Sequence, residues 1–144
     1  MRSVIMYKFS AQSKTKLDTC HPDIQKVLNL AIKFVDITII EGIRTIETQQ
    51  EYVRTGKSKT LDSKHLKQDD GYSHAVDCAL YPVDWSDKAR FIWLGGYLQG
   101  IADTLYQSGE IKNRLTWGGD WDNDQNIKEH SFFDGPHFQL RIID

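Results

Sequence analysis

Two segments of the chain set side chains that can bind a metal ion or move a proton on the polar faces of expected strands. From residue 137 to 142 polar and apolar residues alternate, so that His137 and Gln139 point one way and the apolar residues the other. Residues 75–81 have the same period of two, and Asp77 stands opposite their apolar side chains. If the two segments are neighbours in one sheet, Asp77 and His137 project from the same face.

His65, which lies upstream in a polar loop, is a third candidate ligand. One aspartate and two histidines are suitable zinc ligands, and three protein ligands leave the fourth position of a tetrahedral Zn²⁺ free for water. Such an open position is typical of a catalytic zinc site and not of a structural one. The residues by themselves single out neither zinc nor a substrate.

The elements that must position these residues follow from hydrophobic periodicity and from turn residues. Residues 1–19 are polar and are expected to be irregular, and His21 is expected to start a helix. The periodicity predicts helices at 22–33, 45–54 and 86–108, strands at 34–40, 75–81, 114–117 and 137–142, and long polar connections at 57–74 and 122–133. These elements predict an α+β fold: a small antiparallel sheet with the helices 22–33 and 86–108 on one face and the site on the other.

Length and composition limit the classes of protein to which the chain can belong. Its 144 residues are enough for one core, so we expect a single domain from 1 to 144. The 18 basic and 20 acidic residues leave a net charge of -2, which gives no basic surface for nucleic acid. No segment approaches the length of a membrane span or of a signal-peptide core, so we expect synthesis in a cytoplasm and no stable membrane insertion. Cys20 and Cys78 are expected to be buried free thiols.

Two further features have both a functional and a structural interpretation. Arg44 follows a predicted strand, where it is either a charge at the rim or an electrophile that polarises a carbonyl group or grips a carboxylate. The segment WGGDW (117–121) is either a turn with core aromatic residues or the wall of a substrate cleft. The sequence alone does not decide between these interpretations.

Five segments, taken in order, resemble the zinc peptidases of the hedgehog/D-alanyl-D-alanine peptidase superfamily. The resemblance is greatest to the phage endolysins that are L-alanyl-D-glutamate peptidases. The matching segments are EGIRT (41–45), SKH (63–65), HAVD (74–77), WGGDW (117–121) and DGPHFQL (134–140). Each segment alone would be a weak signal, but the ordered set covers most of residues 20–142.

The resemblance implies a role for each matching residue. It implies the hedgehog/DD-peptidase fold and a bound Zn²⁺ whose ligands are His65, Asp77 and His137. It makes Asp134 the catalytic carboxylate and Arg44 a residue that assists at the substrate carbonyl. Three further residues of the matching segments are expected to contact the substrate: Ser63, Trp117 and Asp120.

The chain departs from the family pattern between its first two ligands. Residues 66–73 lengthen the path from His65 to the segment 74–77, so that His74 becomes a rival ligand. In a strand, however, His74 and Asp77 are three residues apart and point to opposite faces, and a shared ion would need a bulge. We therefore prefer His65. His130 has less family support and is expected to be a loop histidine.

The resemblance also implies a substrate class. We expect a lysin that cuts peptidoglycan stem peptides between L-alanine and D-glutamate, acts on the cell wall after release from the host cytoplasm, and works as a monomer without nucleic acid. A D-alanyl-D-alanine carboxypeptidase is one alternative, although such enzymes usually have glutamate where Asp134 stands. A zinc-containing cell-wall-binding module without activity is the other, because a fold does not imply a function.

Overall fold

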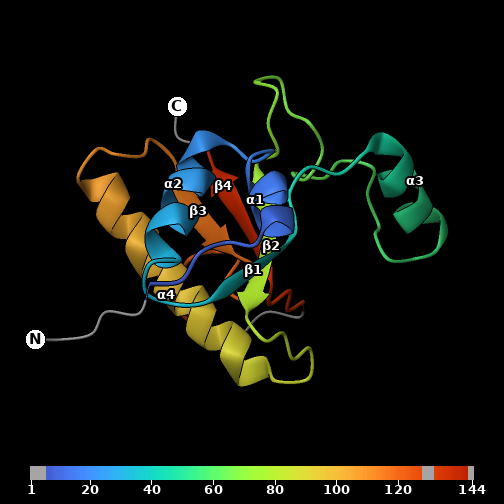
Figure 1. Cartoon of the computed structure of the whole chain (residues 1–144). Coiled ribbons are helices and arrows are strands. Elements are labelled where there is room, and N and C mark those ends of the chain that lie inside the picture. Colours follow the sequence, from blue (N-terminus) through green and yellow to red (C-terminus); the bar gives the residue numbers. More distant parts are fainter. Residues whose placement is uncertain (1–5, 128–131, 143–144) are drawn as a thin grey trace, which may run out of the picture.

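Four antiparallel strands form one sheet in this computed structural model, which describes residues 6–127 and 132–142 (Figure 1). The strands are β1 (Ile37–Glu41), β2 (Ala75–Leu80), β3 (Arg114–Trp117) and β4 (His137–Arg141). Their order across the sheet is β1-β2-β4-β3. The last strand of the chain therefore lies inside the sheet, between β2 and β3, where both of its neighbours fix its position.

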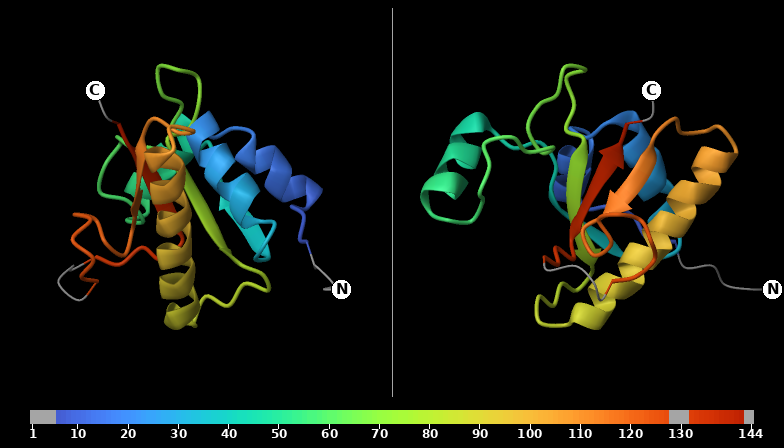
Figure 2. Two further views of the ribbon diagram at one scale, coloured as in Figure 1. Left: turned by 90° about the vertical axis from the view of Figure 1, so that its left-hand side faces the viewer. Right: turned by 180° about the vertical axis from the view of Figure 1, so that it is seen from behind.

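The helices pack mainly on one side of this sheet (Figure 2). They are α1 (Ala11–Leu17), α2 (Pro22–Ala31), α3 (Ile46–Arg54) and α4 (Lys88–Gln107). The long helix α4 contacts α2, β2 and β3, and α1 contacts β1. In contrast, α3 stands apart from the sheet at the end of two connecting segments (Figure 1). The predicted α+β class is confirmed, with a small antiparallel sheet and helices on one face.

The core lies between the sheet and its helices, as the period of two predicts. In β2 and β4 the inward-facing residues Val76, Cys78, Phe138 and Leu140 are buried, while the polar residues between them face the other side. Cys78 and Cys20 are both buried free thiols, as expected. Burial raises the pKa of both, that of Cys20 to about 12, so the thiols stay protonated.

Most predicted boundaries agree with the structure, but the first 19 residues do not. The chain forms α1 there, with the hydroxyl of Ser10 accepting a hydrogen bond from the Ser13 backbone N–H. The Ser13 hydroxyl in turn accepts from the N–H of Ile39 in β1. A seven-residue helix held by polar contacts to a strand has no apolar period to detect. His130 lies outside the described residues.

The predicted strand at 34–40 also starts later than expected. Phe34 and Val35 still donate to the carbonyl of Ala31, so the chain is turning out of α2 until β1 begins at Ile37. β-Branched residues indicate that a segment is suited to a strand, but they do not mark its first residue. Here the hydrogen bonds of the turn after α2 determine where β1 starts.

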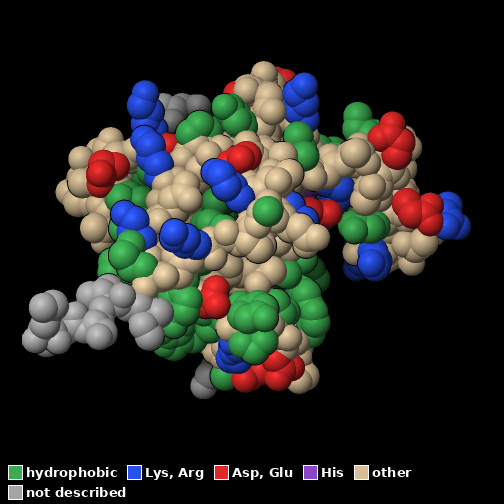
Figure 3. Space-filling view, viewed as in Figure 1, with side chains coloured by type: hydrophobic (Ala, Val, Ile, Leu, Met, Phe, Trp, Pro, Cys, Tyr) green, Lys and Arg blue, Asp and Glu red, His purple; other side chains and the backbone are tan. Residues whose placement is uncertain are grey.

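Charged side chains of both signs are spread over the face in Figure 3, in agreement with the small net charge. Apolar side chains gather at the lower end of that face. Within residues 6–127 and 132–142, every helix is too short or too polar to cross a bilayer.

Two adjacent glycines of α4 allow a matched test of its packing. A methyl group at Gly95 would overlap the indole of Trp117, whereas one at Gly96 would meet open space. We expect Gly95→Ala to lower the free energy of unfolding by about 1–3 kcal/mol through overpacking. Gly96→Ala should raise it by up to about 1 kcal/mol, because alanine favours a helix. Urea unfolding of both variants measures the difference, and equal effects would contradict the close approach.

Candidate metal centre

The pairing of β2 with β4 brings the first two candidate ligands together. Asp77 and His137 are direct partners across the two antiparallel strands, so their side chains leave the same face of the sheet. The distance between His137 Nδ1 and Asp77 Oδ1 is 3.2 Å. Neighbouring strands thus fix both atoms on backbone that has little freedom to move.

His65 reaches the same point from the loop that precedes β2. Its backbone N–H donates to the Ser63 hydroxyl (3.1 Å), and its carbonyl accepts from the backbone N–H of Arg44 (2.8 Å). The ring is 2% exposed, and its Nε2 lies 3.1 Å from Asp77 Oδ1 and 3.3 Å from His137 Nδ1. Three donor atoms therefore form a nearly equilateral triangle, an arrangement that could hold a metal ion.

Outer hydrogen bonds select which nitrogen of each imidazole faces the triangle. The carbonyl of Gly42 can only accept, so His65 Nδ1, at 2.8 Å, carries a proton and Nε2 is left with its lone pair. His137 uses its Nε2 to bond Gln139 Oε1 at 2.9 Å, which turns Nδ1 inward. Such outer partners are typical of metal-binding histidines.

The electrostatics of the triangle favour a cation at its centre. A lone pair on His65 Nε2 that faces a carboxylate oxygen is repelled unless a proton or a metal ion lies between them. Although burial opposes ionisation, the nearby imidazoles of His137 and His65 hold the pKa of Asp77 well below its usual range. For His137, burial is outweighed by the hydrogen bond and charge of Asp77, which raise the pKa of the imidazole. Two nitrogens and one ionised oxygen are a donor set that suits zinc.

Asp134 is held beside the triangle by the turn that leads into β4. Its N–H donates to the carbonyl of Gly118 (2.9 Å), and its carbonyl accepts from the N–H of His137 (3.2 Å). Any side chain at Gly118 would overlap the carbonyl oxygen of Asp134, so this approach requires glycine. Burial raises the pKa of the Asp134 carboxyl, against the opposing charge of His137. A carboxyl with a raised pKa beside a metal centre is suited to proton transfer.

Arg44 lies at the junction of β1 and α3 and is mostly buried. Its Nε and Nη2 donate to the same carboxylate oxygen of Glu41, and Nη1 donates to Gln49 Oε1 at 2.7 Å. The guanidinium also lies over the ring of Tyr52, 4.8 Å from its centroid. The same Glu41 oxygen is 3.8 Å from His65 Nδ1, so Arg44 lies close to the triangle and not at a distant rim.

His74, the rival ligand, lies in a different cluster. Its Nε2 bonds Asp70 Oδ2 at 2.7 Å, and its ring meets that of His21 edge to face at 5.4 Å. His21 itself begins α2 by accepting from the N–H of Asp23, the structural part expected of it. The insertion 66–73 thus folds back onto α2 and directs His74 away from the triangle. The structure brings His65, and not His74, to Asp77 and His137.

The other residues predicted to contact substrate have structural partners. Ser63 supports His65 as described above. Trp117 is 2% exposed, and its Nε1 donates to the carbonyl of Gly135. Asp120 is also buried, and its two oxygens accept from the N–H groups of Asp124 and Gln125. For all three, contact with substrate stays a prediction.

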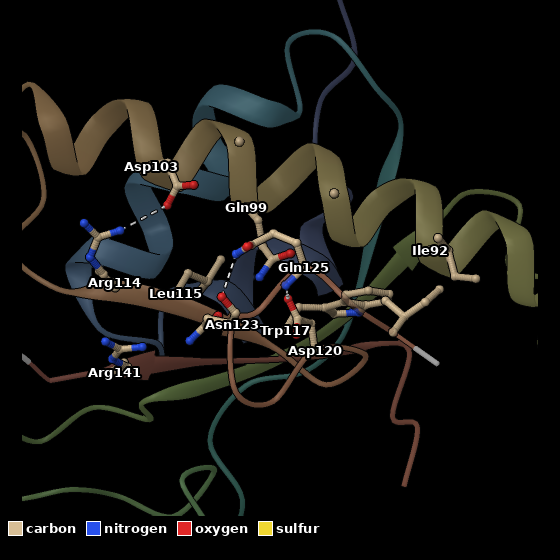
Figure 4. Close-up of a pocket in the computed structure, with 13 residues that line it drawn as sticks. Ile92, Gln99, Asp103, Arg114, Leu115, Trp117, Asp120, Asn123, Gln125 and Arg141 are labelled. Atoms are coloured by element: carbon tan, nitrogen blue, oxygen red, sulfur yellow. Dashed lines mark hydrogen bonds and ion pairs between the residues drawn. The ribbon is translucent and has the colours of Figure 1, made fainter. Parts of the chain in front are cut away.

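Trp117 and Asp120 also line a cavity of about 690 Å³ between α4, β3 and the loop after β3 (Figure 4). None of the three triangle residues lines this cavity. The carboxylates of Asp120, Asp122 and Asp124 lie within 4.8 Å of one another in that loop and could also hold a cation. Each of the three accepts a backbone N–H, however, so loop folding accounts for their convergence.

Several residues at the centre escaped the sequence reasoning. Trp121, and not Trp117, is the indole beside the triangle, with its ring 5.4 Å from that of His137. The period of two already placed Gln139 on the same strand face as His137, but its hydrogen bond to the His137 ring was not predicted. Nothing in the sequence apart from the EGIRT segment indicated that Glu41 would bond Arg44 or that the Gly42 carbonyl would bond His65.

Comparisons with known proteins agree in one assignment. A family model described as phage L-alanyl-D-glutamate peptidase matches residues 5–141. The L-alanyl-D-glutamate peptidase of Escherichia phage T5 is 32% identical over 147 aligned positions, which cover 93% of this chain and 98% of that protein. The crystal structure of the L-Ala D-Glu endopeptidase ChiX of Serratia marcescens is similar, with a TM-score of 0.62 and 30% identity over 93% of this chain and 90% of that one. The resemblance noted in the sequence is thereby confirmed.

Substitution of the two rival histidines tests the ligand set directly. We expect His65→Ala to weaken zinc binding by at least about 100-fold, more than the loss of an outer partner costs. His74→Ala should bind zinc as the wild type does, because its ring bonds Asp70 and not the triangle. Zinc content after dialysis, together with titration against a competing chelator, measures both. The reverse order of effects would make His74 the ligand.

Proposed function

Because the chain belongs to the phage L-alanyl-D-glutamate peptidase family, we propose that it hydrolyses the L-alanyl-D-glutamate bond of peptidoglycan stem peptides. The observation that carries the proposal is the triangle of His65 Nε2, Asp77 Oδ1 and His137 Nδ1. In this proposal the protein is a monomeric phage lysin that acts on the cell wall after its release from the host cytoplasm.

Zinc is the metal that we assign to the triangle. The donors are two imidazole nitrogens and one carboxylate oxygen, and three protein ligands are the usual number at a catalytic zinc. When bound, zinc would lower the pKa of a water molecule and polarise the scissile carbonyl group. Gly42 and Gln139 orient the two imidazoles for this purpose.

Asp134 is the proposed general base. Burial raises the pKa of its carboxyl above that of an ordinary aspartate, which makes the carboxylate a stronger base. In this mechanism the carboxylate takes a proton from the attacking water and then gives it to the amine of D-glutamate as that amine leaves. The turn that fixes Asp134 to Gly118 and His137 holds it in place for both transfers.

Arg44 is proposed to donate to the carbonyl oxygen as negative charge develops on it. A permanently charged guanidinium beside the metal centre stabilises that oxygen more strongly than a neutral donor would. Trp121, whose ring lies next to His137, would cover one side of the bound peptide and exclude water from it.

Mass spectrometry of digested peptidoglycan tests the reaction, the bond and the metal together. We expect fragments with a newly free D-glutamate amine in the presence of zinc, none with a chelator, and recovery when zinc is restored. Release of D-alanine alone would instead identify a D-alanyl-D-alanine carboxypeptidase. A folded, zinc-loaded sample that binds peptidoglycan without cleaving it would be a cell-wall-binding module.

Replacement of Asp134 separates its role from metal binding. Asp134→Ala should lower turnover by at least about 100-fold, the usual effect of losing a general base. Its zinc content should stay that of the wild type, because Asp134 is outside the triangle. Asp18→Ala, at the exposed end of α1, is the matched control and should retain full turnover. Near-normal turnover of the Asp134 variant would exclude the proposed role.

A further inference from the structure

We infer that Gln49 is a positioning residue for Arg44 and holds its guanidinium in the direction of the scissile carbonyl group. The inference rests on the proposed function, in which Arg44 donates to the substrate. Gln49 itself does not touch the substrate in this inference. It lies on α3, the helix that stands apart from the sheet (Figure 1).

Gln49 is buried where a polar side chain is costly. It is 1% exposed and is the one buried residue of α3, while the apolar Ile46 on the same helix is 62% exposed. Helices normally pack through their apolar residues, and burial of an amide is unfavourable unless its donors and acceptor are satisfied. The burial of Gln49 therefore depends on its hydrogen-bond partners.

Those partners fix the orientation of the amide. Its Nε2 donates to the carbonyl of Thr60 (2.7 Å) and to the hydroxyl of Ser58 (3.0 Å). A carbonyl can only accept, so the nitrogen must face Thr60 and Oε1 must face the other way. In that direction Oε1 accepts from Arg44 Nη1 at 2.7 Å. The hydrogen bonds from Gln49 Nε2 to the loop after α3 therefore direct Gln49 Oε1 toward the guanidinium of Arg44.

Hydrogen bonds therefore hold the guanidinium of Arg44 from two sides. Glu41 takes the N–H of Nε and one N–H of Nη2, and Gln49 takes one N–H of Nη1. Three of the five N–H groups are used, which leaves one on each terminal nitrogen for the substrate oxygen. The ring of Tyr52 adds a third contact, because Arg44 Cζ lies over it at 4.8 Å from the centroid.

The neutrality of Gln49 matters for the proposed chemistry. Glu41 already offsets the charge of Arg44, and a second carboxylate at position 49 would oppose the stabilisation of a developing oxyanion. An amide supplies a directed acceptor without a negative charge. This accounts for the choice of glutamine at a buried position that contacts an arginine.

A double-mutant cycle tests the inference. The variants are Gln49→Ala, Arg44→Ala and the combination of both, and kcat and KM are measured on a soluble stem peptide by mass spectrometry. Gln49→Ala should lower kcat about 10-fold to 100-fold, the cost of a misplaced catalytic group. In the Arg44→Ala background the same change should have less than about a twofold effect, because Gln49 acts through Arg44. Zinc content should stay that of the wild type throughout.

Gln50→Ala is the matched control. Gln50 is the neighbouring glutamine of α3 and is exposed, so we expect its loss to leave kcat within about twofold of the wild type. If Gln49→Ala fails to fold, Gln49→Leu, which has a similar volume and no acceptor for the Nη1 hydrogen bond, takes its place in the cycle.

The possible outcomes distinguish this inference from the function on which it rests. A wild-type protein that cleaves no stem peptide would overturn both. Cleavage by the wild type with an unchanged kcat for Gln49→Ala, or equal losses with and without Arg44, would overturn the inference alone. A loss of kcat that disappears in the Arg44→Ala background would support it, because an anchor for α3 alone would lower kcat in both backgrounds.

Discussion

The direct pairing of Asp77 with His137 across β2 and β4 is the constraint on which the rest of the centre depends. A slip of one residue in this register would turn His137 into the core and Phe138 toward the site. The central place of β4, with β2 on one side and β3 on the other, opposes such a slip because two ladders of hydrogen bonds would have to move together. The buried side of both strands thus determines the ligand geometry on the other side.

His65 completes the centre from a segment without regular structure. Its position depends on backbone contacts, with its own carbonyl bonded to Arg44 and its ring bonded to the carbonyl of Gly42. A loop that gives and receives such hydrogen bonds can hold a side chain nearly as firmly as a strand does. The longer path introduced by residues 66–73 is accommodated because that insertion is fixed separately, through Asp70, His74 and His21.

The charges of Asp77 and Asp134 at the centre depend on the groups that surround each of them. Asp77 is ionised beside two imidazoles, whereas burial disfavours the ionised form of Asp134 a few residues before His137. Two carboxyl groups near one another thus have different environments, one suited to binding a cation and the other to exchanging a proton. Arg44 contributes a fixed positive charge, which Glu41 restrains on one side.

The sequence by itself determined the fold class, the period of both ligand strands and, through an ordered set of short segments, the family. These are local properties that adjacent residues specify, which is why the helix from Pro22 and the β3 strand could be predicted closely. Only the tertiary structure decided that His65 and not His74 meets Asp77, because that choice depends on contacts between segments far apart in the chain. The same reason explains why Trp117 is in the core while Trp121 is beside the centre, since two tryptophans of one short segment differ only in what packs against them.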